Sequence, residues 1–570
     1  MEVFVMRSER MVASEWKIFS KYFSGSIQLL PFYETHTLAR QVFSSKVRAN
    51  SDTSYVIYRG KVPCLFITIT AGQVTNILAQ ETIQLSWGTI FLVVDKLFKQ
   101  NFQPTISFTF PQALTIHLQE VFLKHGYKVI ENKSVRKDLA YHTGLILGGG
   151  GARGAYQIGV WQALKELNIS IEIITGTSVG ALNGALILQG DFEVAKDMWE
   201  KIDTQKILSF PTMDVSSETL GGLMSQIGSF TRSAIQSNGV STQPLKDLIQ
   251  ETFSQEKMQQ AATDFYLVTT ELPSMQEKEI RFKSCHSDQW QSWLLASASF
   301  FPAMAATKIA DKYYVDGGYR NNIPVDLALS AGATECIIVD VKGPGIMKPV
   351  KIPTVVNCLN LQTPWTMGAV LLFDGIRSTR NIQLGYLETM KTVGKKYTGY
   401  WYTFAETLSD VTAFQQTFFA YIKETYQIKL WNSMEQKNKI CKKLRRVYKD
   451  RVYTENIGLV LIELLAKSQE ISAYKLYTIK ELASIMQQSE HGKTDLVKSI
   501  GMISVQEWLK KYYEDYFLLS DKQQVSLVNE LLESNEQEKP QRIAFLLEKI
   551  PVQVLQILMR EFIKQGVKEK

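Results

Sequence analysis

The chain has 570 residues, a hydrophobic fraction of 45% and a mean hydropathy of -0.08, which indicate an ordinary globular protein of about two to four domains. Its formal net charge of +7 is modest for this size, and no motif indicates nucleic acid binding. The chain has no uninterrupted apolar run of about 18 residues and its start lacks the pattern of a signal peptide, so we expect neither a membrane-spanning helix nor a secretory leader.

Residues 1–138 are predicted to form an α+β domain. Helical stretches lie between and after its strand-like segments, and one covers residues 113–125. The segment 121–130 resembles the closing helix and strand of a GNAT-type acetyltransferase fold. The glycine-rich loop that such a fold uses for acetyl-CoA is not visible, so the resemblance implies a degenerate domain with a docking or sensing role. The strand-like segments are residues 53–58, 64–69 and 105–110.

A run of glycines connects a short apolar segment, residues 145–147, to a helical pattern over residues 155–164. Backbone amides at the start of a helix attract negative charge. The order of strand, glycine loop and helix therefore predicts a cradle for an anion. The connecting residues are Gly148, Gly149, Gly150, Gly151, Ala152, Arg153 and Gly154.

Further along the chain, Gly176, Ser178 and Gly180 form a G-x-S-x-G motif. The β-branched residues 169–174 predict a strand before it, and the small apolar residues 179–188 predict a buried helix after it. This is the context of a nucleophile elbow, which exposes a serine hydroxyl on a strained turn. Glycine at the flanking positions lets the strand and the helix approach closely. The sequence therefore predicts Ser178 as a nucleophile for acyl transfer.

Two other interpretations of the glycine run stay open. Gly149, Gly151 and Gly154 fit the G-x-G-x-x-G pattern of a dinucleotide site, but Glu172 lies within the second predicted strand and not at its end, where that fold needs an acidic residue. A purely structural glycine turn is the second alternative. A P-loop fits poorly, because no Gly-Lys-Ser or Gly-Lys-Thr follows.

Residues 209–242 are rich in Ser, Gly, Thr and Met, with apolar residues interspersed. One interpretation is a mobile cap over an acyl-chain pocket, with Gly221 and Gly222 as a hinge. An ordinary surface loop with a short amphipathic helix fits the composition equally well.

A serine nucleophile needs a base. His142 directly precedes the first predicted strand. His286 is the one histidine further inside the predicted catalytic span, but its setting is typical of a solvated loop. Asp316 is the better candidate, because the aromatic strand 313–315 leads into it and Gly317 and Gly318 follow it. A plain Asp-Gly hairpin turn is the competing interpretation. Since a free aspartate has a pKa near ~4, it is a weak base at neutral pH, and direct contact with the serine in a low dielectric must raise its basicity. We therefore expect slower turnover than that of a hydrolase with a catalytic triad.

In these motifs the segment 141–392, somewhat under half of the chain, resembles the patatin-like phospholipase family. The glycine loop, the serine elbow and the Asp-Gly-Gly turn occur in the order and approximate spacing of that family. Several motifs that agree in order are far more specific than any one of them. Further matching segments are residues 238–245, 296–302, 322–326 and 337–341.

In that family a Ser–Asp dyad hydrolyses acyl esters of lipids without a histidine. The resemblance implies that Ser178 is the nucleophile and Asp316 its base, and that Gly149, Gly150 and Gly151 form the oxyanion hole. Arg153 matches the basic position of the family and would steady the loop or bind a lipid headgroup. No metal and no cofactor are implied. The supporting positions would be Arg153, Gly154, Gly176, Gly180, Gly317 and Gly318.

Alternating strands and helices indicate an α/β fold with a mostly parallel sheet covered on both faces. Together with the resemblance, this predicts a three-layer α/β/α patatin-like core over residues 141–397, and ligands in such sheets bind at the carboxyl ends of the strands. Its predicted strands are residues 145–147, 171–174, 265–270 and 335–341.

Residues 400–570 are predicted to form a helical domain, because glycine is sparse and Lys, Glu, Leu and Gln dominate. In the run 437–449 the apolar residues Ile440, Leu444, Val447 and Tyr448 share one helix face among cations, as in a helix that lies on anionic lipid. Packing of that face on neighbouring helices is the favoured interpretation. The predicted helices are residues 414–431, 456–467, 504–517, 525–533 and 542–564.

The function that these patterns favour is hydrolysis of phospholipid or related lipid esters through an acyl-enzyme. Transfer of the acyl group to an alcohol or lysolipid is an alternative, and a regulatory or binding protein with a secondary hydrolase core is another. The five cysteines show no paired spacing, which predicts neither disulfides nor zinc and fits the cytoplasm. The positive charge permits peripheral contact with an anionic membrane.

Overall fold

In the computed structural model the chain forms two compact units, and each is described by itself. The first unit comprises residues 1–9, 22–41 and 55–394, and the second comprises residues 10–21, 42–54 and 395–570. The residues that the structure describes are 6–11, 19–23, 32–33, 35–48, 52–80, 82–83, 85–204, 207, 241–286, 288–301, 303–428, 434–448, 452, 456–488, 516, 519–533 and 537–565.

A mixed sheet with helices forms the N-terminal part of the chain, as predicted, and its described strands have the order β1-β2-β3-β4-β5-β7-β6. Phe91, Phe108 and Phe122 pack together in its core, with ring centroids 4.9 to 6.2 Å apart. The resemblance to an acetyltransferase fold stays a prediction. The elements are β1 (Met6–Met11), α2 (His36–Arg48), β2 (Asp52–Arg59), β3 (Val62–Thr70), β4 (Gln73–Ala79), α3 (Trp87–Lys99), β5 (Thr105–Thr109), α4 (Ile116–Lys124), β6 (Lys128–Glu131) and β7 (Ser134–Asp138).

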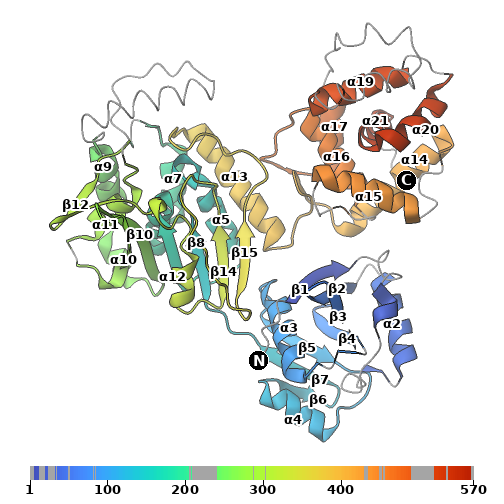
Figure 1. The fold of residues 1–570 in the computed structure, drawn as a ribbon, viewed down its shortest axis with the longest axis horizontal. Helices are drawn as coiled ribbons and strands as arrows, with labels where there is room; N and C mark the ends of the chain where they lie inside the picture. The colour runs from blue at the N-terminus through green and yellow to red at the C-terminus, as the bar shows by residue number, and fades with distance from the viewer. Residues whose placement is uncertain are drawn as a thin grey trace. The chain divides into compact units, whose positions relative to one another are not determined.

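The central sheet has the strand order β12-β13-β10-β9-β8-β14-β15 among the described residues, and β11 pairs with β10. Every neighbouring pair from β10 to β15 is parallel, which confirms the mostly parallel sheet. β11, β12 and β13 add antiparallel strands. Figure 1 shows β12 at one edge and β15 at the other. The strands are β8 (Thr143–Leu147), β9 (Ile173–Thr177), β10 (Asp264–Leu272), β11 (Gln276–Arg281), β12 (Thr307–Ile309), β13 (Lys312–Asp316), β14 (Glu335–Val339) and β15 (Asn357–Leu361).

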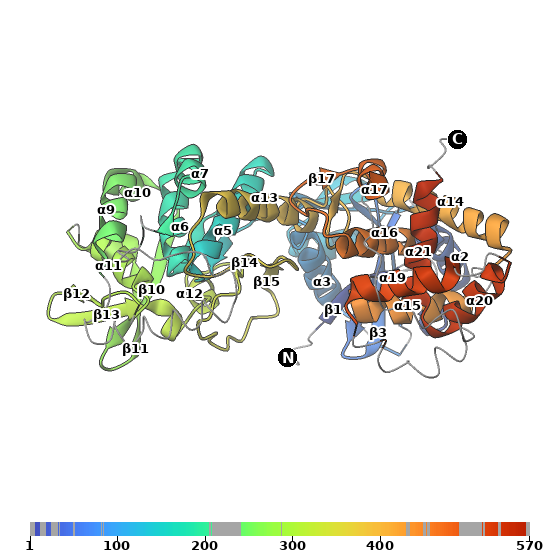
Figure 2. The same ribbon diagram turned by 90° about the horizontal axis from the view of Figure 1, so that it is seen from above.

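Helices cover both faces of this sheet. The parallel connections from β8 to β9 and from β9 to β10 run in one direction, so right-handed crossovers put α5 and α6 on one face. Helix α12 lies on the opposite face, because Ala328 packs against Gly144, which pairs with Ile173, whereas α6 packs against the next residue, Ile174. Figure 2 shows α13 beside α5, and the two helices cross closely at Gly159 and Gly385. The helices are α5 (Ala155–Glu166), α6 (Val179–Gln189), α7 (Phe192–Glu200), α9 (Gln243–Thr252), α10 (Gln255–Gln260), α11 (Trp290–Ala298), α12 (Val325–Ser330) and α13 (Gly375–Thr392).

The strand before the serine differs from its predicted range. β9 begins at Ile173 and continues to Thr177, so Glu172 precedes the strand instead of lying within it. The carboxylate of Glu172 accepts the N–H of Thr143 at the start of β8, at 2.7 Å. This acidic residue therefore fastens the beginning of the sheet, and it lies at the strand end opposite to the one that a dinucleotide site would need.

The described residues of the C-terminal part, 395–570, are helical apart from one two-residue parallel pair, β16 (Thr403–Phe404) with β17 (Leu476–Tyr477). The predicted helix 542–564 is two helices, because Pro551 cannot continue the backbone hydrogen bonding of a helix interior and instead begins α21. The predicted helix 504–517 lies almost entirely outside the described residues. The helices are α14 (Leu408–Tyr426), α15 (Met434–Tyr448), α16 (Ile457–Ser468), α17 (Ile479–Gln488), α19 (Asp521–Glu533), α20 (Lys539–Lys549) and α21 (Pro551–Lys564).

Helix α15 contains the run with apolar and basic residues. Ile440, Leu444 and Tyr448 are all buried, and α15 packs on α16 and α21. The apolar face is therefore occupied by neighbouring helices, as the favoured interpretation expects, and is not available to a lipid surface. Among the residues that the structure describes, no helix combines the length and the apolar character needed to cross a bilayer.

Candidate active site

Ser178 occupies a strained turn between β9 and α6. Its backbone has φ 58° and ψ −127°, a conformation that costs free energy in a residue with a Cβ. The turn is possible because strand and helix meet without side chains: a Cβ on Gly176 would lie 2.3 Å from the carbonyl oxygen of Gly180, and one on Gly180 would lie 2.1 Å from that of Leu147. This is the geometry of a nucleophile elbow.

A second serine holds this turn. Ser297, at the end of α11, has no exposed surface, and its Oγ accepts the backbone N–H of Ser178 at 3.0 Å. The same hydroxyl donates to the carbonyl of Val268 on β10 at 2.6 Å. The sequence singled out the segment 296–302 but gave Ser297 no role, since nothing local shows which backbone group a buried hydroxyl will reach.

The registers of three strands bring Asp316 to the serine. Thr177, the last residue of β9, pairs with Val268 of β10, and the next residue of β10, Thr269, pairs with Asp316 at the end of β13. The turn after β9 and the end of β13 therefore lie on either side of one strand. The Asp316 carboxylate lies close enough to the Ser178 side chain for the hydroxyl to favour the charged form of the carboxyl, and both residues line one cavity.

The Asp316 carboxyl lies in a desolvated setting and is only 4% exposed. Burial raises its pKa to about 6, against the hydrogen bonds from Ser178 and from the backbone N–H of Gly318, which favour the charged form. The Gly318 N–H donates to Oδ1 at 2.7 Å. The carboxylate is therefore both oriented and more basic than a free aspartate.

The glycines after Asp316 form a 3-10 turn, Gly317–Tyr319, and the chain then enters α12. The alternative interpretation, a plain Asp-Gly hairpin, is wrong. A Cβ on Gly317 would lie 2.3 Å from the carbonyl oxygen of Val268. Glycine is needed here because the turn passes directly over the backbone of β10.

Two residues of the glycine loop lie at the site. Gly150 and Gly151 line the same cavity as Ser178, and their N–H groups bond to none of the described residues. Gly149, which the family resemblance also assigned to the oxyanion hole, donates its N–H to the carbonyl of Asn322 at 3.1 Å. Gly151 has φ +56°, and a Cβ there would lie 2.2 Å from the carbonyl oxygen of Val370.

Arg153 binds backbone on both sides of the loop. Its Nε donates to the carbonyl of Gly368 at 2.8 Å and its Nη1 to that of Lys342 at 2.5 Å. Gly154 sits against α6, where a Cβ would lie 2.4 Å from a methyl carbon of Val179. Of the two roles considered for Arg153, these bonds correspond to steadying the loop.

A buried polar chain anchors the glycine loop to the helices behind it. Gln157 on α5 donates to the carbonyl of Gly148 at 2.7 Å and accepts from Asn183 on α6 at 2.8 Å. Asn183 in turn accepts from the indole N–H of Trp199 on α7 at 3.0 Å. The sequence did not indicate this chain, because Asn183 stands in a helix that looks uniformly small and apolar.

A mostly apolar cavity of about 150 Å³ opens beside Ser178 and Asp316. These two residues, Gly150 and Gly151 line it, and α6, α7, α9 and α11 supply much of the rest. Such a space suits a hydrocarbon chain. Its apolar lining includes Val179, Leu182, Leu186, Met198, Trp199, Ile202, Ile207, Leu245, Leu248, Ile249, Phe253, Phe300, Met304, Ile346, Val370, Leu371 and Phe373.

Two further sequence predictions, a histidine base and a mobile cap, concern the surroundings of this cavity. His286 is exposed and is not among the residues that line it, and the described lining contains no histidine. The predicted cap, residues 209–242, lies almost entirely outside the described residues. The helices on either side of that segment, α7 and α9, both contribute to the cavity.

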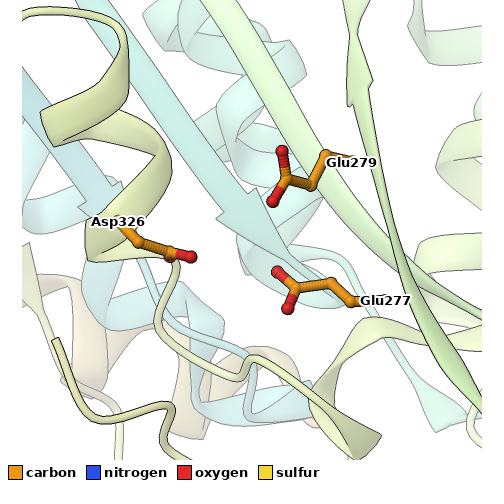
Figure 3. Close-up of side chains that lie close together, drawn as sticks. All are labelled: Glu277, Glu279 and Asp326. Carbon is orange, nitrogen blue, oxygen red and sulfur yellow. The ribbon is translucent and has the colours of Figure 1, made fainter.

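Glu277, Glu279 and Asp326 are the described residues grouped closely enough to hold a metal ion. Figure 3 shows the two glutamates projecting from one strand toward Asp326 at the start of α12. Lys348 already contacts Glu277 at 3.0 Å and Asp326 at 2.5 Å, and the Asn321 side-chain amide donates to both. The ammonium group of Lys348 thus already supplies a positive charge to this cluster. The contacts of Lys348 and Asn321 with the carboxylates hold the loop that carries Lys348 close to the turn after Asp316.

We expect Ser297→Ala to slow covalent labelling of Ser178 by a fluorophosphonate about tenfold, because the lost hydrogen bond releases the strained backbone. Ser299→Ala is the matched control: it removes a buried hydroxyl two positions away that bonds Leu295 and Thr307. Labelling rates are read by intact mass. Equal rates for Ser297→Ala and the control would contradict the assigned positioning role.

Comparison with known proteins relates part of this chain to one family. The family model described as patatin-like phospholipase matches residues 145–329. Patatin-like phospholipase domain-containing protein 7 of Rattus norvegicus is 29% identical over 35% of this chain and 13% of its own length. The human patatin-like phospholipase domain-containing protein 6 is 28% identical over 40% of this chain and 16% of its own length.

A third relative, lysophospholipase nte1 of Aspergillus terreus, is 31% identical over 35% of this chain and 12% of its own length. The chain thus spans less than a fifth of the length of each of these relatives. The glycine loop, the elbow and the Asp-Gly-Gly turn all lie within the matched residues. Residues 145–329 of this chain are therefore a patatin-like phospholipase domain.

Proposed function

We propose that the protein is a serine acyl hydrolase that cleaves carboxylic esters of lipids. The observation that carries the proposal is the close approach of the Ser178 side chain to the buried Asp316 carboxylate, beside an apolar cavity. A nucleophile, a base and a place for an acyl chain meet at one point. The names of the relatives, patatin-like phospholipase and lysophospholipase, support the same class of substrate.

In the proposed first step, Asp316 takes the proton of Ser178 as Oγ attacks the ester carbonyl carbon. The N–H groups of Gly150 and Gly151 stabilise the oxyanion, and Gly149 supports the loop through its bond to Asn322. Asp316 then gives the proton to the leaving alcohol. Water then attacks the carbonyl carbon of the acyl-enzyme in the same way: Asp316 accepts a water proton and returns it to Oγ as the fatty acid leaves.

Ser178→Ala and Asp316→Asn should each lower hydrolysis of a lipid ester by at least about 10³-fold, because the first change removes the nucleophile and the second removes the base. Hydrolysis is measured as fatty acid released by purified protein. Ser299→Ala is the control that should retain activity. If Ser178→Ala kept the wild-type rate, Ser178 would not be the nucleophile.

The acid limb of the pH profile reports Asp316. A base acts when it is ionised, and burial raises the Asp316 pKa to about 6, so activity should be high above this pH and fall as the pH drops through it. The measurement is kcat/KM for a soluble ester that does not titrate. A single inflection near pH 4, the value of a free aspartate, would contradict a desolvated base.

We further propose that this protein is cytoplasmic and contacts lipid surfaces peripherally. Ile346 lines the cavity and is 57% exposed, and its neighbour Met347 is 64% exposed. These side chains form an apolar surface beside the cavity, where a lipid ester would pass from the bilayer into the site.

Met347→Asp should weaken sedimentation with anionic phospholipid vesicles about tenfold, because a charge replaces an apolar contact with the bilayer. Hydrolysis of a soluble ester should not change. Val355→Asp is a matched control, since Val355 is 62% exposed and does not line the cavity. Equal loss of vesicle binding in both variants would argue against a contact specific to Met347.

A further inference from the structure

Two cysteines face each other on neighbouring strands at the edge of the central sheet. Cys336 of β14 pairs in register with Cys358 of β15, and the two strands are parallel. In-register residues of neighbouring strands point to the same face, and their Cα atoms lie about 4.8 Å apart, inside the range of about 4.4–6.8 Å that a disulfide spans. A bond between these sulfurs therefore needs no movement of the sheet backbone.

The two thiols already interact and differ in their surroundings. Cys336 is buried in the core, whereas Cys358 is exposed. A hydrogen bond from Cys336 lowers the pKa of the Cys358 thiol, and the same bond, with burial, raises the pKa of Cys336. The accessible sulfur is thus the one whose thiolate is stabilised, and thiolate character together with access governs reactivity toward oxidants.

We propose that Cys358 and Cys336 form a reversible thiol–disulfide pair that reacts with hydroperoxides. The Cys358 thiolate attacks one peroxide oxygen, the O–O bond breaks, and Cys358 becomes a sulfenic acid while the other oxygen leaves as water or an alcohol. The Cys336 sulfur then attacks the Cys358 sulfur, the S–O bond breaks, and water leaves. With hydrogen peroxide, two thiols and one peroxide give one disulfide and two water molecules.

The other cysteines lack this arrangement. Cys64 and Cys441 are buried, and burial raises the pKa of Cys285, which is half-buried.

The Cys336–Cys358 pair also has a structural consequence. Its disulfide would join the edge strand β15 to β14, and β15 leads into the loop that supplies Val370 to the cavity and the Gly368 carbonyl to Arg153.

The test exposes the native full-length protein to hydrogen peroxide, blocks the remaining thiols under denaturing conditions and maps the peptides by mass spectrometry. We expect a Cys336–Cys358 peptide pair that has lost two hydrogens, three of the five thiols still open to alkylation, and full recovery after dithiothreitol. Intact folded protein that alkylates at all five positions after treatment would overturn the proposal, as would a linkage between any other pair.

Variants separate the two roles. Cys336→Ser should stop the reaction at a Cys358 sulfenic acid that dimedone traps, and Cys358→Ser should slow loss of thiols at Cys336 at least about tenfold, since the accessible thiolate is gone. Cys285→Ser is the control and should still form the pair. If Cys285 oxidised as fast as Cys358 in the wild type, the selectivity on which the proposal rests would be refuted.

Discussion

The hydrogen-bond ladder that joins β9, β10 and β13 is the constraint on which the candidate site depends. Ser178 and Asp316 come from distant parts of the chain, and no local pattern brings them together. They meet because one strand, β10, pairs with both of their strands, in parallel on one side and antiparallel on the other. A slip of either register by one residue would turn the side chains to opposite faces and separate the pair.

The second constraint is the close approach of backbones around that pair. At Gly176, Gly180 and Gly317 a Cβ would lie 2.1 to 2.3 Å from a carbonyl oxygen of a neighbouring segment. The elbow, the glycine loop and the turn after Asp316 can therefore lie this close together only because glycine, which has no side chain, occupies these positions. Ser178 retains a Cβ in a left-handed conformation, and Ser297 holds its amide in place.

The sequence predicted the parts of the site that local pattern encodes: a strand before Ser178, a helix after it, and a turn after Asp316. What it could not predict depends on contacts made across the fold. The Gly149 amide is engaged by Asn322, which stands far away in the chain, and Ser297 reaches Ser178 from another helix. The antiparallel strand β11 was missed because its short polar sequence lacks the apolar alternation of a half-buried strand.

Arg153 shows how a motif can mislead about recognition. A guanidinium next to an acyl site suggests a receptor for the phosphate of a lipid, yet two of its N–H groups already serve the carbonyls of Gly368 and Lys342. Hydrogen bonds from a charged group are worth about 1.5–3 kcal/mol each, so these two bonds fix the guanidinium against the loop, and only its remaining N–H groups could bind a phosphate without breaking them. The side chain that the motif offers as a receptor thus commits two of its donors to keeping the glycine loop in shape, and its first task is internal support.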